Sequence, residues 1–499
     1  MSLRLHNTLS GQIEEFKPLV DNEVRIYTCG PTVYDYAHIG NYRTFVFQDI
    51  LRRYLKYLGF QVKQVMNLTD VDDKTIRNSQ AAGMGLRDYT QKFIDAFAVD
   101  RELLNLETPE LMVRATDYIE DMVKLVEILE QKGFAYRSEG SVYFRVSAFK
   151  DYGKLSKINL SGNRAGARVD ADEYEKDDAR DFVLWKAAKP GEPSWQTPFG
   201  SGRPGWHLEC STMAMKRLGE SFDIHSGGSD LIFPHHENEI AQSEAATGKP
   251  FARFWLHAEH LIVNGEKMSK SAGNFYTLRD LVVQGHKPSA VRYLLASAPF
   301  HKPLNFTFEG LHQAQKSIER LRNFRYRLTM ERFRAGENPA MAERAGRARR
   351  EFEEALDNNL NTAEALAAIF DLVTDGNTAM DHGEFREGDR HGLLDVLDRW
   401  DRMFAVLEDN DYARLRHHGL INVREEGAGE AALAGSKDGE SGHPALESLS
   451  DEEIALQIAL RNTARRTGHY ADSDRIRESL LKAGVILEDT KVGTRWKRK

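Results

Sequence analysis

The segment from residue 24 to residue 69 places the strongest constraint on the fold. Residues 24–29 (VRIYTC) form a β-rich run that ends at the turn Gly30-Pro31. Residues 45–58 (FVFQDILRRYLKYL) have apolar side chains at helical spacing, and a second β-like run, QVKQVMNLT, follows. Because a crossover helix is the usual way to join two parallel strands, this order predicts an α/β fold with a parallel sheet.

The rest of the chain divides by pattern. Residues 108–204 mix short strands such as SVYFRV with loops rich in Gly, Pro and charge, which predicts an insertion in the first domain. The α/β pattern resumes at FDIHSGGSD and FWLHAEHLIVNG, so we expect the first domain to cover residues 1–310. Long helical patterns, including AEALAAIFDLVTDG, predict a helical bundle over residues 311–421.

The C-terminal part begins with a change of composition. Residues 422–450 are rich in Gly, Ala, Ser and Glu and almost lack large apolar residues, which is typical of a flexible linker. We therefore expect a small separate domain over residues 451–499. A chain of 499 residues is in any case too long for one hydrophobic core.

Composition excludes several classes of protein. No apolar run reaches the roughly 18 residues that span a bilayer, and the N-terminus lacks the pattern of a signal peptide, so we expect a cytoplasmic protein with no membrane contact. With only Cys29 and Cys210, a disulfide framework is excluded. The net charge of −8 argues against indiscriminate nucleic-acid binding but allows local basic patches.

The run FPHHENEIAQSE suggests a metal site. His235 and Glu239 lie four residues apart, so a helix opened by Pro234 would present both on one face. Cys29 and Cys210 are the available soft ligands, and a Cys, Cys, His, Glu set suits zinc. A pairing of His236 with Glu239 is also possible, as is a self-paired helix start beside two buried thiols.

Two separate motifs suggest phosphate binding. PTVYDYAHIGN follows the first strand, so His38 and Gly40 lie where a nucleotide would meet backbone N–H groups and the positive end of a helix. Far downstream, in the loop 265–275, NGEKMSKSAGN places Lys267 and Lys270 three residues apart between glycines. Two ammonium groups on such a loop suit a mobile clamp for a polyphosphate.

These motifs together resemble a known family. PTVYDYAHIGN and KMSKS look like the two signatures of class I aminoacyl-tRNA synthetases, and NLTDVDDK, DFVLWK, GWHLECSTM and FDIHSGGSDLIFPHHENEIAQSE resemble the cysteinyl-tRNA synthetases. The likeness runs from LHNTLSG near the start to ADSDRIRESLLKAGVILEDTKVGTRW near the end. It implies a Rossmann-like catalytic domain, a helical bundle that contacts tRNA and a C-terminal anticodon-binding domain.

The resemblance also implies roles for individual residues. The zinc ligands of the family match Cys29, Cys210, His235 and Glu239. The amino-acid pocket of the family matches Thr69, Trp206, His225 and Asp230. Because a borderline-soft cation binds a thiolate far better than a hydroxyl, the zinc would separate cysteine from serine, which shape alone separates only modestly.

The implied reaction has two steps: cysteine and ATP give cysteinyl-adenylate and pyrophosphate, and the cysteinyl group then passes to tRNA(Cys). His38, Gly40 and Asn41 are expected at ATP, Lys267 and Lys270 at the leaving pyrophosphate, and Mg²⁺ with the phosphates. Asn41 replaces the second His of the first signature and lacks a cationic form. Ser226 replaces the usual Gly, and SAPFHKPLNF also departs from the family pattern.

The C-terminal end suggests RNA contact. Residues 461–499 carry more Lys and Arg than Asp and Glu, and the tail places Trp496 among basic residues, which suits phosphate contact with base stacking. We expect a monomer. Three alternatives remain open: a cysteine ligase with an amino-sugar acceptor, a zinc-dependent hydrolase built on HHENE, and a non-catalytic RNA-binding protein with structural zinc.

Overall fold

The computed structural model describes residues 2–158, 180–270 and 272–420, together with parts of 454–498. By its internal contacts the chain divides into two units. The first comprises Met1–Phe275 and Ser289–Asp409, and the second comprises Tyr276–Pro288 and Asn410–Lys499. All residues predicted to bind metal, nucleotide or amino acid belong to the first unit.

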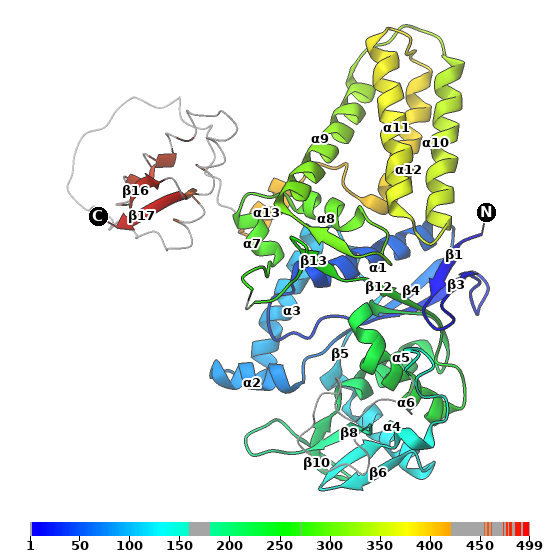
Figure 1. The fold of residues 1–499 in the computed structure, drawn as a ribbon, viewed down its shortest axis with the longest axis vertical. Helices are drawn as coiled ribbons and strands as arrows, with labels where there is room; N and C mark the ends of the chain where they lie inside the picture. The colour runs from blue at the N-terminus through cyan, green and yellow to red at the C-terminus, as the bar shows by residue number, and fades with distance from the viewer. Residues whose placement is uncertain are drawn as a thin grey trace, which may run out of the picture. The chain divides into compact units, whose positions relative to one another are not determined.

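A parallel sheet forms the centre of the first unit and confirms the predicted α/β class (Figure 1). Its order is β12-β11-β3-β4-β5, and neighbouring strands are parallel. The strands are β3 (Glu23–Thr28), β4 (Gln61–Leu68), β5 (Leu111–Arg114), β11 (Phe222–Gly228) and β12 (Ala252–Ala258). The chain runs from β3 to β4 and β5 on one side, and β11 and β12 lie on the other. The strand order therefore reverses between β3 and β11, where α/β folds place their ligands.

Helix α1 (Ile39–Tyr57) connects β3 with β4 and begins earlier than the apolar pattern at residue 45 predicts. A capping box explains the early start: the His38 side chain accepts the Asn41 backbone N–H, and the Asn41 side chain accepts the His38 backbone N–H. Gly40 and Asn41 therefore lie in the first turn of α1.

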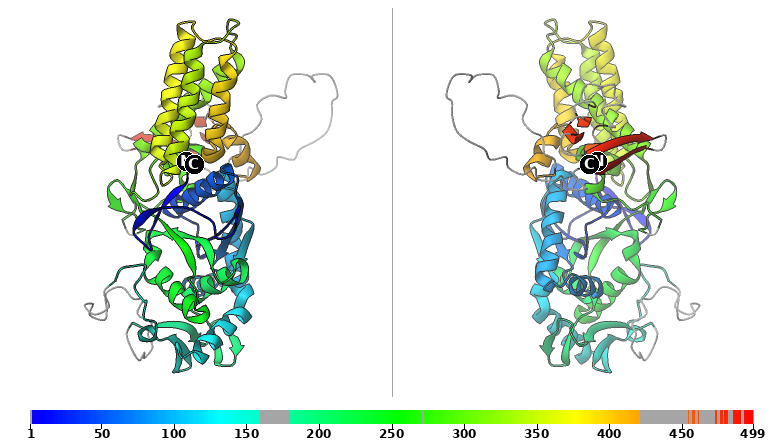
Figure 2. Two further views of the ribbon diagram at one scale, coloured as in Figure 1. Left: turned by 90° about the vertical axis from the view of Figure 1, so that its right-hand side faces the viewer. Right: turned by 90° about the vertical axis from the view of Figure 1, so that its left-hand side faces the viewer.

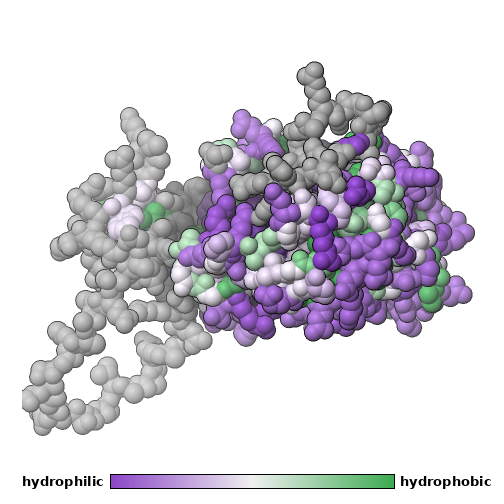
Figure 3. Space-filling view, turned by 90° about the horizontal axis from the view of Figure 1, so that it is seen from below, coloured by the Kyte–Doolittle hydropathy of each residue, from purple (hydrophilic) through white to green (hydrophobic). Residues whose placement is uncertain are grey.

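The predicted insertion contains an antiparallel sheet, in the order β6-β7-β8-β10-β9. Its strands are β6 (Ala135–Ser138), β7 (Ser141–Phe144), β8 (Phe182–Ala187), β9 (Trp195–Thr197) and β10 (Gly200–Pro204). The predicted boundary near residue 108 needs correction, because β5 at 111–114 pairs with β4 in the parallel sheet. Its four residues are too short a run to show their sheet from pattern alone. Seen from this end, the described surface is mostly hydrophilic, with hydrophobic residues in small groups (Figure 3).

Helices and short strands surround the parallel sheet. Those that bear on the site are α5 (Trp206–Leu218), which follows β10, and α6 (Glu237–Thr247), which joins β11 to β12. The other helices and strands of this region are β1 (Arg4–Asn7), β2 (Gln12–Glu15), α2 (Asp73–Ala81), α3 (Leu86–Leu103), α4 (Ile119–Gln131), β13 (Leu261–Val263), β14 (Glu266–Lys267), α8 (Pro288–Ala296) and β15 (Leu304–Phe306).

A helical bundle completes the first unit, as predicted (Figures 1 and 2). Its helices, which run side by side in both views, are α9 (Phe308–Met330), α10 (Pro339–Asp357), α11 (Thr362–Asp381) and α12 (Asp389–Phe404). Leu311, Ile318 and Phe324 are among the buried residues of α9, and they recur at helical spacing along one stripe. Phe352 of α10 and Trp400 of α12 are fully buried as well.

The second unit contains α7 (Leu278–Val283), α13 (Asp411–His417) and the antiparallel pair β16 (Val485–Thr490) and β17 (Gly493–Arg498). Ile454, Ile458, Leu480, Val485 and Leu487 form a small apolar cluster. The predicted linker, 422–450, lies outside the described residues. Among the described residues, no helix is both long enough and apolar enough to span a bilayer.

Candidate active site and metal centre

Cys29, Cys210, His235 and Glu239 come together in the folded chain, as the family resemblance implies. Each offers one ligand atom, and these atoms lie within 4.8 Å of one another. All four side chains are buried. Two thiols, an imidazole and a carboxylate at this separation are a donor set that zinc prefers.

The carboxyl end of β3 places the first of these ligands. Cys29 directly follows β3, at the point where the strand order reverses. The next residue must be glycine, because a Cβ on Gly30 would lie 1.9 Å from the backbone oxygen of Asn67. Cys210 lies in α5, whose N-terminal end follows the last strands of the insertion.

The turn between β11 and α6 places the other two ligands, in a way that differs from the prediction. Pro234 does not open a helix: it lies inside the turn Ile232–His236, and α6 begins at Glu237. Phe233 has extended backbone (φ −139°, ψ 134°), because a residue before proline is driven away from the helical region. His235 therefore precedes α6, while Glu239 lies in its first turn.

A second set of four potential ligands shares two residues with the first. Cys29, His225, His236 and Glu239 also lie within 4.8 Å of one another, so the pairing of His236 with Glu239 is geometrically possible, as the sequence indicates. His236 Nδ1 lies 2.7 Å from His257 Nε2, and its other ring nitrogen, Nε2, lies 3.3 Å from Cys29 Sγ. His225 Nε2 lies 2.9 Å from Glu239 Oε2.

The contacts of His235 are those of a metal-bound imidazole. Its Nδ1 lies 2.9 Å from Nδ1 of His207, which orients the ring, and its Nε2 lies 3.0 Å from Glu239 Oε1. Among the described residues, Glu239 Oε1 is a buried oxygen that accepts no hydrogen bond. An orphaned carboxylate oxygen that faces an imidazole nitrogen and two thiols fits a bound cation.

The electrostatics of Glu239 agree with a cation site. Burial by itself would raise the pKa of Glu239, but the neighbouring His225 and His235 imidazoles outweigh burial and lower it to about 2. Burial would likewise lower the pKa of His235, but Glu239 and Cys210 raise it to about 10. The site thus favours positive charge between the thiol of Cys210 and the carboxylate of Glu239.

The predicted nucleotide residues lie at the start of α1. His38 Nδ1 accepts the Asn41 N–H at 3.1 Å, so the proton of the neutral ring is assigned to Nε2. Burial lowers the pKa of His38 to about 4, although Asp230 partly opposes this. A Cβ on Gly40 would lie 3.0 Å from the His38 ring and 3.1 Å from Met268 Cε, so this turn lies against the KMSKS loop.

The KMSKS loop is held by contacts of its own. Ser269 donates its backbone N–H to Asn274 Oδ1 at 2.8 Å, and Asn274 donates to the backbone oxygen of Lys267 at 3.2 Å. The ammonium of Lys270 is bonded to Asp35, and it also lies 5.1 Å from the centre of the Phe275 ring. Lys267 is exposed at the end of β14.

The predicted amino-acid residues differ in their contacts. The Trp206 and His235 rings lie against each other, with centroids 4.1 Å apart and planes tilted by 33°. Thr69 is buried and accepts a hydrogen bond from Asn67 Nδ2 at 3.1 Å. The charge of Asp230 acts to raise the pKa of both the Cys29 thiol and the His38 imidazole.

Several residues of the site escape analysis of the sequence. His207 and His257 are second partners of His235 and His236, and Asp35 is the partner of Lys270. His225, predicted in the amino-acid pocket, contacts Glu239, one of the four potential metal ligands. Asp35 and His207 did carry a signal, since they belong to the motifs PTVYDYAHIGN and GWHLECSTM.

Comparison with known proteins places the chain in a family. A model of tRNA synthetase class I (C) catalytic domains matches residues 15–316, and a DALR-domain model matches residues 351–408. Cysteine–tRNA ligases of Koribacter versatilis and Solibacter usitatus are each 54% identical to this chain over the full length of both proteins. That of Chlamydia muridarum is 43% identical, again over both full lengths.

Solved structures share the fold at greater distance. A methionyl-tRNA synthetase of Mycobacterium tuberculosis, solved in complex with methionyl-adenylate, superimposes with a TM-score of 0.60 at 17% identity. The match covers 79% of this chain and 93% of that one. With relatives this similar over its whole length and a matching catalytic-domain model, the chain belongs to the cysteine–tRNA ligase family of class I aminoacyl-tRNA synthetases.

Proposed function

We propose that this chain activates L-cysteine with ATP and transfers the cysteinyl group to tRNA(Cys), with a zinc site formed by Cys29, Cys210, His235 and Glu239 that selects cysteine. The observation that supports this best is the buried cluster of those four side chains at the carboxyl ends of the parallel strands. A zinc ion held there would prefer a substrate thiolate to the hydroxyl of serine. Mg²⁺ would accompany ATP, held mainly by phosphate oxygens and water.

The first step needs alignment more than a protein nucleophile, because the carboxylate of cysteine attacks the α-phosphorus directly. The neutral His38 ring uses Nδ1 within the capping box, so Nε2–H is the group that would donate to a phosphate oxygen. Gly40 and the amide of Asn41 lie at the positive end of α1, which attracts phosphate. Lys270, with Lys267, would neutralise the leaving pyrophosphate.

The amino-acid pocket would surround the metal cluster. Asp230 would pair with the ammonium group of cysteine, since its negative charge acts on both Cys29 and His38. Trp206, whose ring lies against that of His235, would close over the small side chain, and Thr69 would line the same wall. His225 would act through its 2.9 Å contact with Glu239, whose orientation it fixes.

The second step requires RNA contacts beyond the parallel sheet. The helical bundle, which includes the DALR match, and the C-terminal domain at 451–499 would hold the tRNA. Trp496 in β17 is half-buried, and the basic residues around it would contact phosphates. We further propose that the protein acts as a cytoplasmic monomer.

Exchange of labelled pyrophosphate into ATP tests this function. We expect exchange with cysteine, none with serine, and loss after zinc removal that returns when zinc is restored. Metal content measured in parallel should fall in a Cys210→Ser variant, because a hydroxyl is a poor zinc ligand. Equal exchange with serine would contradict the role of zinc. Charging of tRNA(Cys) then separates this enzyme from a ligase with an amino-sugar acceptor, and the family match already speaks against a zinc hydrolase.

A further inference from the structure

Arg292 of α8 is fully buried, and all five of its N–H donors are used. Nε donates to the backbone oxygen of Phe404 at 2.5 Å, and Nη1 donates to those of Leu104 and Asn105 at 3.0 and 3.2 Å. Nη2 donates to Asp49 Oδ2 at 2.6 Å and to the backbone oxygen of Met403 at 3.0 Å. A buried guanidinium with every donor satisfied is fixed in one geometry.

The acceptors from residues 402–405 are the free carbonyls at the C-terminal end of α12. A helix leaves its last carbonyls without intrahelical partners. Among the described residues at this helix end, only the carbonyl of Asp401 accepts a backbone hydrogen bond, from the N–H of Ala405. Arg53 of α1 donates to the oxygen of Arg402 at 3.1 Å, and Asn105 donates to that of Ala405 at 3.1 Å. Arg53 and Arg292, two cationic side chains from outside the bundle, therefore cap the negative C-terminal end of α12.

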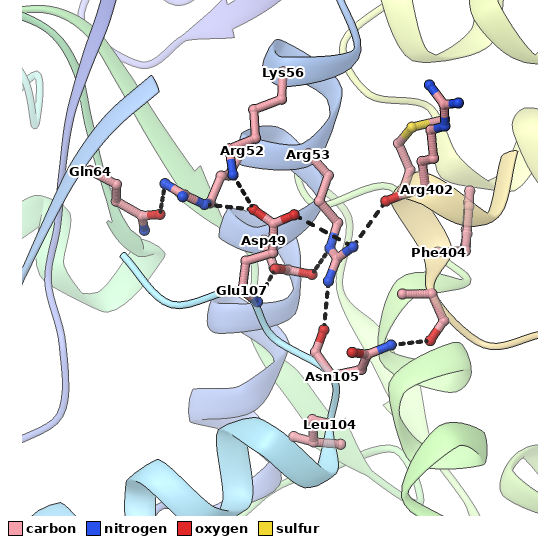
Figure 4. Close-up of polar contacts among 12 residues, drawn as sticks. Asp49, Arg52, Arg53, Lys56, Gln64, Leu104, Asn105, Glu107, Arg402 and Phe404 are labelled. Atoms are coloured by element: carbon pink, nitrogen blue, oxygen red, sulfur yellow. Dashed lines mark hydrogen bonds and ion pairs between the residues drawn. The ribbon is translucent and has the colours of Figure 1, made fainter. Parts of the chain in front are cut away.

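Asp49 joins this cap to α1. Its Oδ2 accepts from Arg292 and also from Arg53 Nε at 2.7 Å, while its Oδ1 accepts the Glu107 backbone N–H at 2.7 Å. Figure 4 shows Arg53 between Asp49, Asn105 and Arg402, with Glu107 beside Asp49. Asp49, Arg53, Asn105 and Arg292 together form what we name the α1–α12 junction.

A second contact ties α1 to the bundle. The hydroxyl of Tyr54 donates to Asp357 Oδ1 of α10 at 2.7 Å, and it also lies 3.1 Å from the oxygen of Glu353. His38 caps the other end of α1, eleven residues before Asp49, or about 16 Å at the rise of an α-helix. Because a helix moves as one body, the orientation of the bundle and the position of the nucleotide-binding turn are coupled.

We infer that Arg292 is a positioning residue for the second step of the reaction: through the α1–α12 junction it fixes the helical bundle, and any tRNA bound to the bundle, relative to the adenylate site. This inference rests on the proposed function. It predicts that changes at the junction slow transfer to tRNA more than adenylate formation. Transfer needs the bundle and the catalytic domain in the correct relative orientation, whereas adenylate formation needs only the catalytic domain.

The test uses full-length Arg292→Lys and Arg53→Met variants. Lysine keeps the charge but has three donors on one atom and cannot serve five separated acceptors. Single-turnover transfer of cysteine from preformed adenylate to tRNA(Cys) should fall about tenfold or more, because small misplacement of reactants is costly, while pyrophosphate exchange stays within about twofold. The KM for tRNA should rise, and the KM for ATP and cysteine should not.

Arg52→Met is the matched control. Arg52 of α1 is also buried, but among the described residues it bonds Glu107, Glu110 and Gln64 and no residue of the bundle. Its loss should change both steps by the same factor. Folding of each variant is checked by thermal unfolding, and if Arg292→Lys does not fold, the less buried Arg53→Met decides.

The results separate this inference from the proposed function. If folded junction variants slow both steps equally, or slow neither, the positioning role is wrong. If the unaltered chain itself shows no cysteine-dependent exchange, the proposed function is wrong, whatever the variants do.

Discussion

Lys270, the lysine proposed to bind pyrophosphate, is held only by a weak ion pair. Its ammonium pairs with Asp35, but both side chains are exposed, 62% and 36% respectively. An ion pair so open to water contributes about 0–1 kcal/mol, so a polyphosphate can easily take over the lysine. The same contact keeps the KMSKS loop close to the turn that carries His38.

Replacing Lys270 therefore tests its chemistry rather than its structure. We expect Lys270→Ala to lower the rate of pyrophosphate exchange about 100-fold, the usual effect of removing one group that stabilises charge in the transition state. Asp35→Asn, which removes only the exposed pair, should change the KM for ATP by no more than about threefold. Steady-state kinetics of exchange measure both, and an Ala variant with nearly normal turnover would rule out the proposed role.

Single residues differ in how far the sequence reveals them. Cys29, Cys210, His235 and Glu239 come from three distant stretches, and their spacing left a self-paired helix start equally possible. Only the resemblance united them, and the folded chain brings them within 4.8 Å. The sequence gives no sign of the role of Arg292, because four of its five acceptors are backbone oxygens, which any residue type supplies.

Among the elements, the loop at 152–156 is hydrogen-bonded to the first turn of α6. Glu237, fully buried in the first turn of α6, accepts N–H bonds from Gly153 and Ser156 at 2.8 Å and from Leu155 at 3.1 Å. The hydroxyl of Ser156 donates to it as well, at 2.8 Å. A loop of the insertion thus holds the turn of α6 that also carries Glu239.

Weakening the hydrogen bonds between this loop and Glu237 should weaken metal binding. In Glu237→Gln an amide N–H₂ would meet backbone N–H donors, and the lost charged hydrogen bonds should destabilise the fold by about 2–3 kcal/mol. Because α6 carries Glu239, we expect faster zinc release to a chelator. Ser156→Ala, which removes one bond of the four, should cost about 1 kcal/mol and serve as the milder case. Unchanged zinc release in a destabilised Gln variant would limit the loop to a structural role.

Elements were predictable where one periodicity ran long enough. The helices of the bundle and the β3–α1–β4 unit follow from period and order. The start of α1 was missed because a capping box of His38 and Asn41 replaces an apolar pattern there, and β5 was missed because four residues carry too little pattern. The helix expected at Pro234 failed because proline constrains the residue before it, Phe233.

At the scale of the whole molecule, buried neutral histidines link stability to pH. Burial lowers the pKa of His38 to about 4 and that of His257 to about 3, from an ordinary value of 6.5. Burial also lowers the pKa of His207 and His236 well below that value. The unfolded chain therefore binds more protons than the folded chain below pH 6.5, so acid favours unfolding.

We expect the contribution of these four histidines to the free energy of unfolding to be complete above about pH 6.5 and to fall as the pH drops towards 4, by about 1.4 kcal/mol per pH unit for each such histidine. His235 acts in the opposite direction, because its pKa of about 10 in the folded chain adds stability that is lost as the pH rises from 6.5 to 10. Denaturant unfolding at a series of pH values measures the slope. His38→Asn removes one titrating group and should therefore reduce the slope by the contribution of one histidine, about 1.4 kcal/mol per pH unit. An identical slope in the variant would show that His38 is not protonated on unfolding.

The reversal of strand order between β3 and β11 has a consequence for how such an enzyme can diverge. The residues proposed to select cysteine gather at that reversal, whereas the bundle begins only at Phe308, after the last strand of the catalytic region. A lineage can thus inherit a new choice of amino acid or a new RNA partner through changes in separate stretches of the gene. Only the few side chains that cap α12 would have to be kept through both.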